Sequence, residues 1–157
     1  WYLDQGYSAD ILNAVLQRQT HCVYDFDCRV KAVAEFRQLH EAQILATANK
    51  RVSKLLEKET MINGASKIDD ALCELSAERD LSSMINNKET VVMPLFAQAN
   101  YKQALFELAR LGEPVDQFFV DVMVMVDDEK VRNNRLALLA KLRNLFLQVA
   151  DISLLQS

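Results

Sequence analysis

The sequence predicts an all-α protein, folded as an antiparallel helical bundle. Its 157 residues include only 3 Gly and 2 Pro, too few turn residues for a sandwich of many short strands. Half of the residues are hydrophobic and a quarter are charged, which is the composition of a folded chain and not of a disordered one. Apolar residues recur every three or four positions along most of the chain, the spacing of an amphipathic helix. The length fits a single domain.

Capping residues and apolar stripes predict where the helices begin and end. In chain order, we expect helices from Ser8 to Leu16, from Asp25 or Asp27 to about Leu39, from about Glu41 to Glu57, from Ser76 to about Ala99, from Asn100 to Leu111, from Val115 to Val126 and from Asp127 to about Val149. Asn63-Gly64 predicts a loop between the third and fourth helices. Gly112 with Pro114 just beyond predicts the end of the fifth.

The segment from Val122 to Val126 is open to two interpretations. Its valines are β-branched and favour a strand. However, Val115, Phe118, Phe119, Val122 and Val126 repeat at helical spacing, and no partner strand is visible elsewhere in the sequence. We therefore expect this segment to be helical.

The last predicted helix is apolar on two sides. Leucines line its main stripe, while Leu136 and Ala140 lie on the opposite side. A helix that is apolar nearly all round belongs at the centre of a bundle. Arg135 projects close to the middle of the main stripe, where a buried guanidinium requires a carboxylate. We expect Arg135 to form a structural ion pair with an acid such as Asp121 or Asp128.

Several classes of function find no support in the sequence. His21 and His40 stand apart from any Ser or Cys motif, so we expect no catalytic residue. The three cysteines form no C-x-x-C pair, which argues against a metal site or a disulfide framework and fits a cytoplasmic compartment. No apolar run is long enough to cross a membrane, and no glycine-rich loop could hold a phosphate. The start lacks a Met and a basic leader, so we expect part of a longer protein.

Charge is segregated along the chain although the net charge is only -4. From Lys130 to Arg143 there are five basic residues and no acid, whereas from Glu107 to Glu129 there are seven acids and one arginine. The helix from Glu41 to Glu57 carries a second basic stripe. If both basic surfaces face one groove, they form a path for the phosphates of single-stranded nucleic acid. The candidates for RNA binding are Lys50, Arg51, Lys54, Arg132, Asn134 and Arg143. Solvated charge on a protein-interaction module is the alternative.

Several segments carry a resemblance to a known family. The segment from Glu113 through Leu139, continuing to Leu155, closely resembles the C-terminal end of the bacterial glycyl-tRNA synthetase beta subunit. Upstream, Gly6-Tyr7, the stretch from Arg29 to Arg37 and the stretch from Ala48 to Leu56 look like the same family in the same order. In that family this region is a DALR-type anticodon-binding domain, an all-helical bundle. The resemblance implies one domain, with leading helices over residues 1–40 and a DALR-like core over about residues 41–157.

The resemblance also implies partners and chemistry outside this chain. The parent enzyme is a heterotetramer of two alpha and two beta subunits that uses ATP and magnesium to attach glycine to tRNA. Its alpha subunit holds the ATP and glycine site. This chain would then bind the tRNA(Gly) anticodon loop, beside the rest of the beta subunit, without catalysing a reaction. The alternative is a helical module that docks the beta subunit onto another subunit or domain.

The genetic code defines what such a domain must recognise. Every glycine codon begins with GG, so the matching anticodons end in two cytosines. A cytosine offers acceptors at O2 and N3 and a donor at N4, so its reader needs Arg, Lys or Asn beside a carboxylate or carbonyl, and a flat surface for stacking. The junction from Asp127 to Arg135 carries such hydrogen-bonding groups.

Overall fold

A computed structural model describes residues 1–18, 23–59 and 67–155, and within these ranges it contains helices and no strand. The α-helices are α1 (Ala9–Leu16), α2 (Val23–Phe36), α3 (His40–Lys58), α4 (Ser76–Ala97), α5 (Tyr101–Ala109), α6 (Gly112–Asp121) and α7 (Glu129–Leu147). Two short 3₁₀ helices, η1 (Asp70–Leu72) and η2 (Ile152–Leu154), complete them. The predicted all-α class is confirmed. The loop predicted at Asn63-Gly64 lies outside the described residues.

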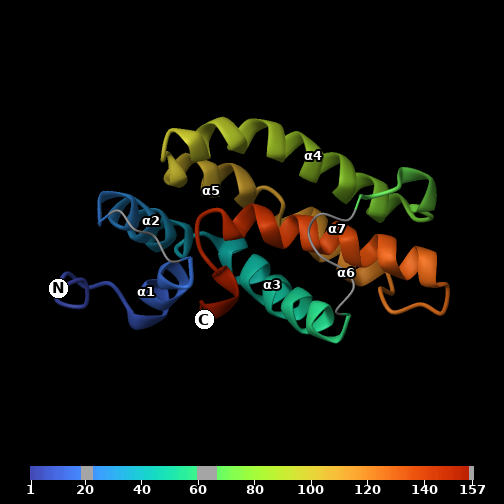
Figure 1. Cartoon of the computed structure of the whole chain (residues 1–157), viewed down its shortest axis with the longest axis horizontal. Helices are drawn as coiled ribbons and strands as arrows, with labels where there is room; N and C mark the ends of the chain where they lie inside the picture. Colours follow the sequence, from blue (N-terminus) through green and yellow to red (C-terminus); the bar gives the residue numbers. More distant parts are fainter. Residues whose placement is uncertain (19–22, 60–66, 156–157) are drawn as a thin grey trace.

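Helix α7 runs through the middle of the molecule, between α4 on one side and α3 on the other (Figure 1). It begins at Glu129 and is capped by Asp128, whose carboxylate accepts hydrogen bonds from the backbone N–H groups of Lys130 and Val131. Leu136 and Leu138 lie on opposite sides of the helix, and both are fully buried. Two-sided burial places α7 at the centre of the core, as its apolar pattern predicts.

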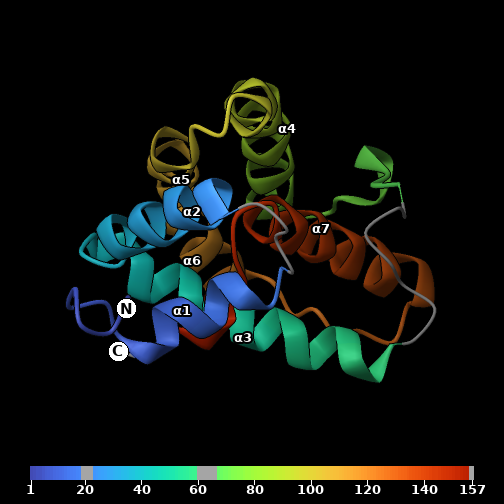
Figure 2. The same cartoon turned by 60° about the vertical axis from the view of Figure 1, so that its left-hand side comes forward.

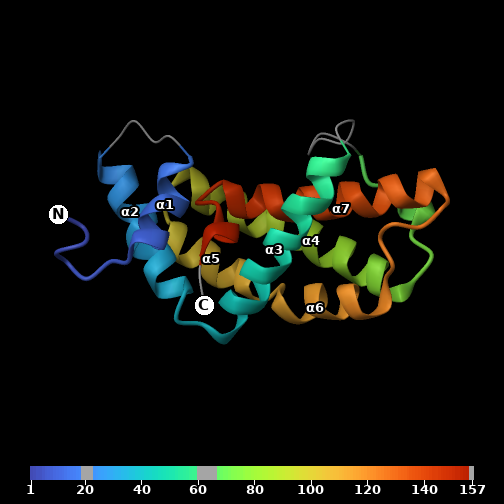
Figure 3. The same ribbon diagram turned by 90° about the horizontal axis from the view of Figure 1, so that it is seen from below.

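Helices α3 and α6 pack against each other, and Figure 3 shows α3 crossing in front of α7, with its beginning beside the beginning of α6. Their first turns lie very close. A Cβ added to Gly112 would be 3.1 Å from the Cβ of Glu41, so only a glycine lets the two backbones approach without a shift. This contact fixes the orientation of α6 against α3.

Helices α1 and α2 lie together at one end of the bundle (Figure 2), and Arg29 on α2 ties them to the core. Its guanidinium donates to the backbone carbonyls of Gln148 and Val149, which follow α7, at 2.7 and 2.9 Å. It also lies 4.4 Å from the centroid of the Tyr101 ring on α5. Burial raises the pKa of Asp25, but hydrogen bonds from Tyr101 and Arg29 outweigh it and hold the pKa of this carboxyl below its usual range.

The helix predicted through Val122 to Val126 is wrong, because α6 ends at Asp121. The segment that follows has no regular structure, and its side chains alternate: Val122 and Val124 are buried, whereas Met123 and Met125 are exposed. Two of its carbonyls accept hydrogen bonds from arginines of α7. Arg135 donates to the carbonyl of Met123 at 2.7 Å, and Arg132 donates to that of Val126 at 3.0 Å.

Two predicted helix boundaries also need correction. Asp25 and Asp27 do not cap α2, since the helix begins earlier, at Val23. Helix α5 ends earlier than predicted, at Ala109, and Gly112 is the first residue of α6 and not the stop signal of α5. In contrast, Asn100 caps α5 as predicted, and its side-chain oxygen accepts from the backbone N–H of Gln103.

Candidate nucleic-acid interface

The outward face of α3 carries cations that form no ion pair with a described residue. Leu45 and Val52 on the opposite face are fully buried in the core, and the helical period therefore turns Lys50, Arg51 and Lys54 to the surface, where all three are exposed. None of the three forms an ion pair with another described residue. These side chains are free to meet phosphates, and we call them the α3 basic face.

A cleft beside the α3 basic face is lined by a cation and an aromatic ring. The guanidinium of Arg51 lies 4.5 Å from the centroid of the Phe119 ring on α6. The cleft has a volume of about 350 Å³, and we call it the α3–α6 cleft. Its lining residues are His40, Gln43, Ile44, Thr47, Ala48, Arg51, Val115, Asp116 and Phe119. Asp116 is exposed there, with no ion pair to a described residue.

The cations of α7 are held differently from those of α3. Arg143 forms an ion pair with Asp151 at 3.5 Å, and its side chain is 18% exposed. Arg132 is half-buried and donates to the carbonyl of Val126. Neither residue lines the α3–α6 cleft. The structure therefore does not bring the two predicted basic surfaces together in this cleft, and Arg132 and Arg143 already have protein partners.

Asn134 is buried and cannot read a base from this position, which corrects its prediction as an RNA-binding residue. Its amide oxygen accepts from the backbone N–H of Asp69 at 2.7 Å, and its amide nitrogen donates to the carbonyl of Asp69 at 3.0 Å. A second contact from the nitrogen reaches the sulfur of Cys73 at 3.6 Å. The side chain thus joins the segment around η1 to α7.

Arg135 is buried and paired with an acid, but the acid is Glu78 on α4 and neither Asp121 nor Asp128. The Nε of Arg135 lies 2.7 Å from Oε1 of Glu78, and the two side chains are 4% and 1% exposed. The same carboxylate accepts from the backbone N–H of Leu75 at 2.8 Å. A guanidinium that also binds the carbonyl of Met123 has few donors left for a ligand.

Sequence reasoning missed the α6 side of the cleft, namely Phe119 and Asp116. A signal for Phe119 exists in the sequence, because Phe118 and Phe119 are adjacent and side chains one residue apart on a helix point about 100° apart. Only one of them can face the centre of the core. Phe118 is fully buried, and Phe119 is the one that reaches the surface. No comparable signal marks Asp116.

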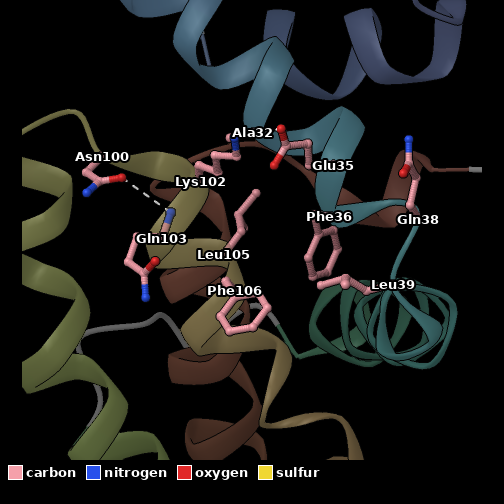
Figure 4. Close-up of a pocket in the computed structure, with 10 residues that line it drawn as sticks. All are labelled: Ala32, Glu35, Phe36, Gln38, Leu39, Asn100, Lys102, Gln103, Leu105 and Phe106. Carbon is pink, nitrogen blue, oxygen red and sulfur yellow. Dashed lines mark hydrogen bonds and ion pairs between the residues drawn. The ribbon is translucent and has the colours of Figure 1, made fainter.

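A second hollow lies between α2 and α5. Figure 4 shows Phe36 and Leu39 on one side of it and Leu105 and Phe106 on the other. Its volume is about 760 Å³, and the Phe106 side chain is 51% exposed. An ion pair of 2.7 Å between Lys102 and Glu35 stands at its rim. We call this hollow the α2–α5 groove.

Two other kinds of site are not found in the described ranges. No group of three or more His, Cys, Asp or Glu residues there is arranged to hold a metal ion. No described helix has the length and apolar character needed to cross a membrane.

Comparison of the sequence with known proteins finds a matching family and close relatives. Residues 45–153 match the family described as the DALR anticodon binding domain. The chain is 54% identical to the glycine–tRNA ligase beta subunits of Shewanella amazonensis and Shewanella woodyi, and 52% identical to that of Aliivibrio fischeri. Each alignment covers 99% of this chain and 22% of the relative, so the chain spans about a fifth of the length of these curated relatives. The chain therefore belongs to the DALR anticodon-binding domain family.

Proposed function

We propose that this chain is the anticodon-recognition domain of a glycine–tRNA ligase beta subunit and that it binds the anticodon loop of tRNA(Gly). The observation that carries the proposal is the α3 basic face, a set of exposed cations without ion pairs to described residues, beside a half-buried aromatic ring, in a member of a family of anticodon-binding domains. Cations contact phosphates without regard to sequence, whereas stacking and base-edge contacts provide recognition. The two cytosines that end a glycine anticodon are the bases to be read.

The same proposal assigns the remaining steps of aminoacylation to other parts of the enzyme. The heterotetramer of two alpha and two beta subunits, in the cytoplasm, would use ATP and magnesium at a site on the alpha subunit. Nothing in the described residues of this chain resembles a metal site, and its contribution is to hold the correct tRNA. Arg132 and Arg143 would add positive potential near the loop rather than direct contacts, because each has a protein partner.

Binding of this chain to RNA stem–loops tests the proposal. We expect tighter binding to a tRNA(Gly) anticodon stem–loop than to the same stem–loop with both cytosines replaced by uridine. Lys50→Ala should weaken binding to both, because a phosphate contact is lost in each case. Lys31→Ala on α2 is the matched control, since Lys31 is an exposed lysine paired with Asp27 and lies outside the α3 basic face. Equal binding to both stem–loops would contradict anticodon recognition.

Docking onto the rest of the beta subunit is a second candidate function, and the α2–α5 groove supports it. An exposed phenylalanine in an apolar groove with a polar rim is typical of a protein contact. The relatives are several times longer than this chain, and their additional domains are the occupant that we propose. Phe106→Ser should weaken assembly of the full beta subunit while leaving stem–loop binding unchanged. Loss of RNA binding instead would remove the distinction between the two surfaces.

A further inference from the structure

The α3–α6 cleft has the stacking surface that an unstacked base requires. The Phe119 ring lies against the Arg51 guanidinium, and a guanidinium supported in this way offers a flat, delocalised plane. Bases that leave a stacked loop are received on arginine planes and aromatic rings. The close approach of α3 and α6 at Gly112 holds the two walls of the cleft in register. The surface is therefore preorganised and is not formed only on binding.

The cleft also has hydrogen-bonding groups of opposite kind. Arg51 supplies donors only, and the carboxylate of Asp116 supplies acceptors only. Both residues line the cleft, one from α3 and one from α6, and neither is engaged in an ion pair with a described residue. A ligand that fits must present a flat face to the Arg51 plane, a donor to Asp116 and acceptors at the edge of the guanidinium.

We propose that the α3–α6 cleft receives one of the two anticodon cytosines, with the base stacked on Arg51 over Phe119 and its N4 amino group donating to Asp116. The N–H groups of the guanidinium lie in its own plane, so they point past the stacked base and remain for an oxygen of a flanking phosphate. This assignment rests on the function proposed above. Uracil has the opposite groups, because its O4 is an acceptor and its N3 is a donor. Asp116 would face a carbonyl oxygen of uracil without a hydrogen bond, so the cleft rejects uracil.

The position of the cleft favours a nucleotide over a peptide. Lys50 and Lys54 lie on the same outward side of α3, one residue before and three residues after Arg51. Both side chains are exposed, so they can meet the phosphates of a nucleotide whose base is held at Arg51. An acidic peptide would gain from the lysines but would meet the negative charge of Asp116. A nucleotide avoids this conflict, since its charge lies on the backbone and its base presents the amino group.

Asp116→Asn tests the proposal through the discrimination between cytosine and uracil. We measure the affinity of the 157-residue chain for anticodon stem–loops in which each of the two cytosines is replaced singly by uridine. The unsubstituted chain should prefer cytosine by about tenfold at one of the two positions. Asparagine has both a carbonyl and an amide group, so the variant should accept either base and lose most of that preference. Circular dichroism and thermal unfolding confirm that the variant is folded.

Glu113→Gln is the matched control for this experiment. It removes one exposed negative charge from the same helix, but residue 113 does not line the cleft. The control should tighten binding to both stem–loops slightly and leave the preference for cytosine unchanged. If the two variants reduce the preference equally, the effect is one of net charge and the assignment of Asp116 is wrong.

Phe119→Leu separates stacking from base reading. Leucine keeps an apolar side chain but removes the ring, so affinity for the cytosine and uridine stem–loops should fall together, by about tenfold. If Lys50→Ala weakens binding while Asp116→Asn and Phe119→Leu have no effect, the cleft proposal is overturned and the proposed function stands. If the chain shows no cytosine-dependent binding at all, both are overturned.

Discussion

Helices α3 and α7 both carry several arginines and lysines in the sequence, but the structure gives the two sets of cations different environments. On α7, Arg135, Lys141 and Arg143 form ion pairs with acids from α4 and from the segment after α7. On α3, Lys50 and Lys54 are exposed and have no such partner among the described residues. The difference follows from burial. A central helix must neutralise its cations within the protein, whereas a peripheral helix leaves them for solvent or a ligand.

The largest expected effect concerns Arg135. Arg135→Ala should lower the free energy of unfolding by about 3 to 5 kcal/mol, because Glu78 would remain buried as an unpaired charge. Urea unfolding followed by circular dichroism measures it. Replacing both residues together, as in Arg135→Met with Glu78→Leu, should cost much less than Arg135→Ala alone. If the double variant is as unstable as the single one, the loss comes from packing and not from the uncompensated charge.

A smaller effect is expected for Asn134. Asn134→Ala should lower the free energy of unfolding by about 1 to 3 kcal/mol, since the backbone N–H and carbonyl of Asp69 both lose their partner. RNA affinity should not change in the folded variant, because Asn134 is buried. Thermal unfolding and stem–loop titration check the two statements. A variant with full stability and weaker RNA binding would show that Asn134 contacts the RNA directly.

The smallest effect on stability, with a measurable effect on binding, is expected for Lys54. Lys54→Ala should change the free energy of unfolding by less than about 0.5 kcal/mol. It should reduce the slope of log affinity against log salt by about 0.7 if it removes one contact to single-stranded RNA. Lys141→Ala on α7 is the control, because that ammonium is paired with Glu89 at 2.9 Å. If Lys141→Ala lowers the slope as much as Lys54→Ala, the RNA covers α7 and the contrast between the two helices does not hold.

Features set by neighbouring residues could be predicted from the sequence. The caps at Asn100 and Asp128 depend on backbone groups two or three residues away. The helices that they begin follow from the spacing of apolar residues. The position of α7 at the centre followed in the same way, because a helix that is apolar on two sides must be covered on two sides. Likewise, the exposed stripe on α3 is a consequence of which of its residues are apolar.

Features set by contacts between distant residues could not be predicted. The partner of Arg135 lies 57 positions away, and the segment bound by Asn134 lies 65 positions away. The sequence places Asp121 and Asp128 nearer to Arg135, but it does not show which helix faces α7. The error at Val122 to Val126 has the same origin. The spacing of its apolar residues fits a helix locally. In the folded bundle, however, two arginines of α7 donate hydrogen bonds to the carbonyls of Met123 and Val126.

The guanidinium of Arg29 has a consequence for how the chain folds. It closes the end of the central helix from a position 119 and 120 residues earlier in the chain, and the nearby rings of Phe36 and Phe146 lie 6.1 Å apart between their centroids. Contacts of such sequence separation form only after a large loss of chain entropy. We therefore expect the last turn of α7 to gain this cap only when α2 docks. Residues 45–153 alone would leave the carbonyls of Gln148 and Val149 without this donor, so the cooperative folding unit extends upstream to include α2.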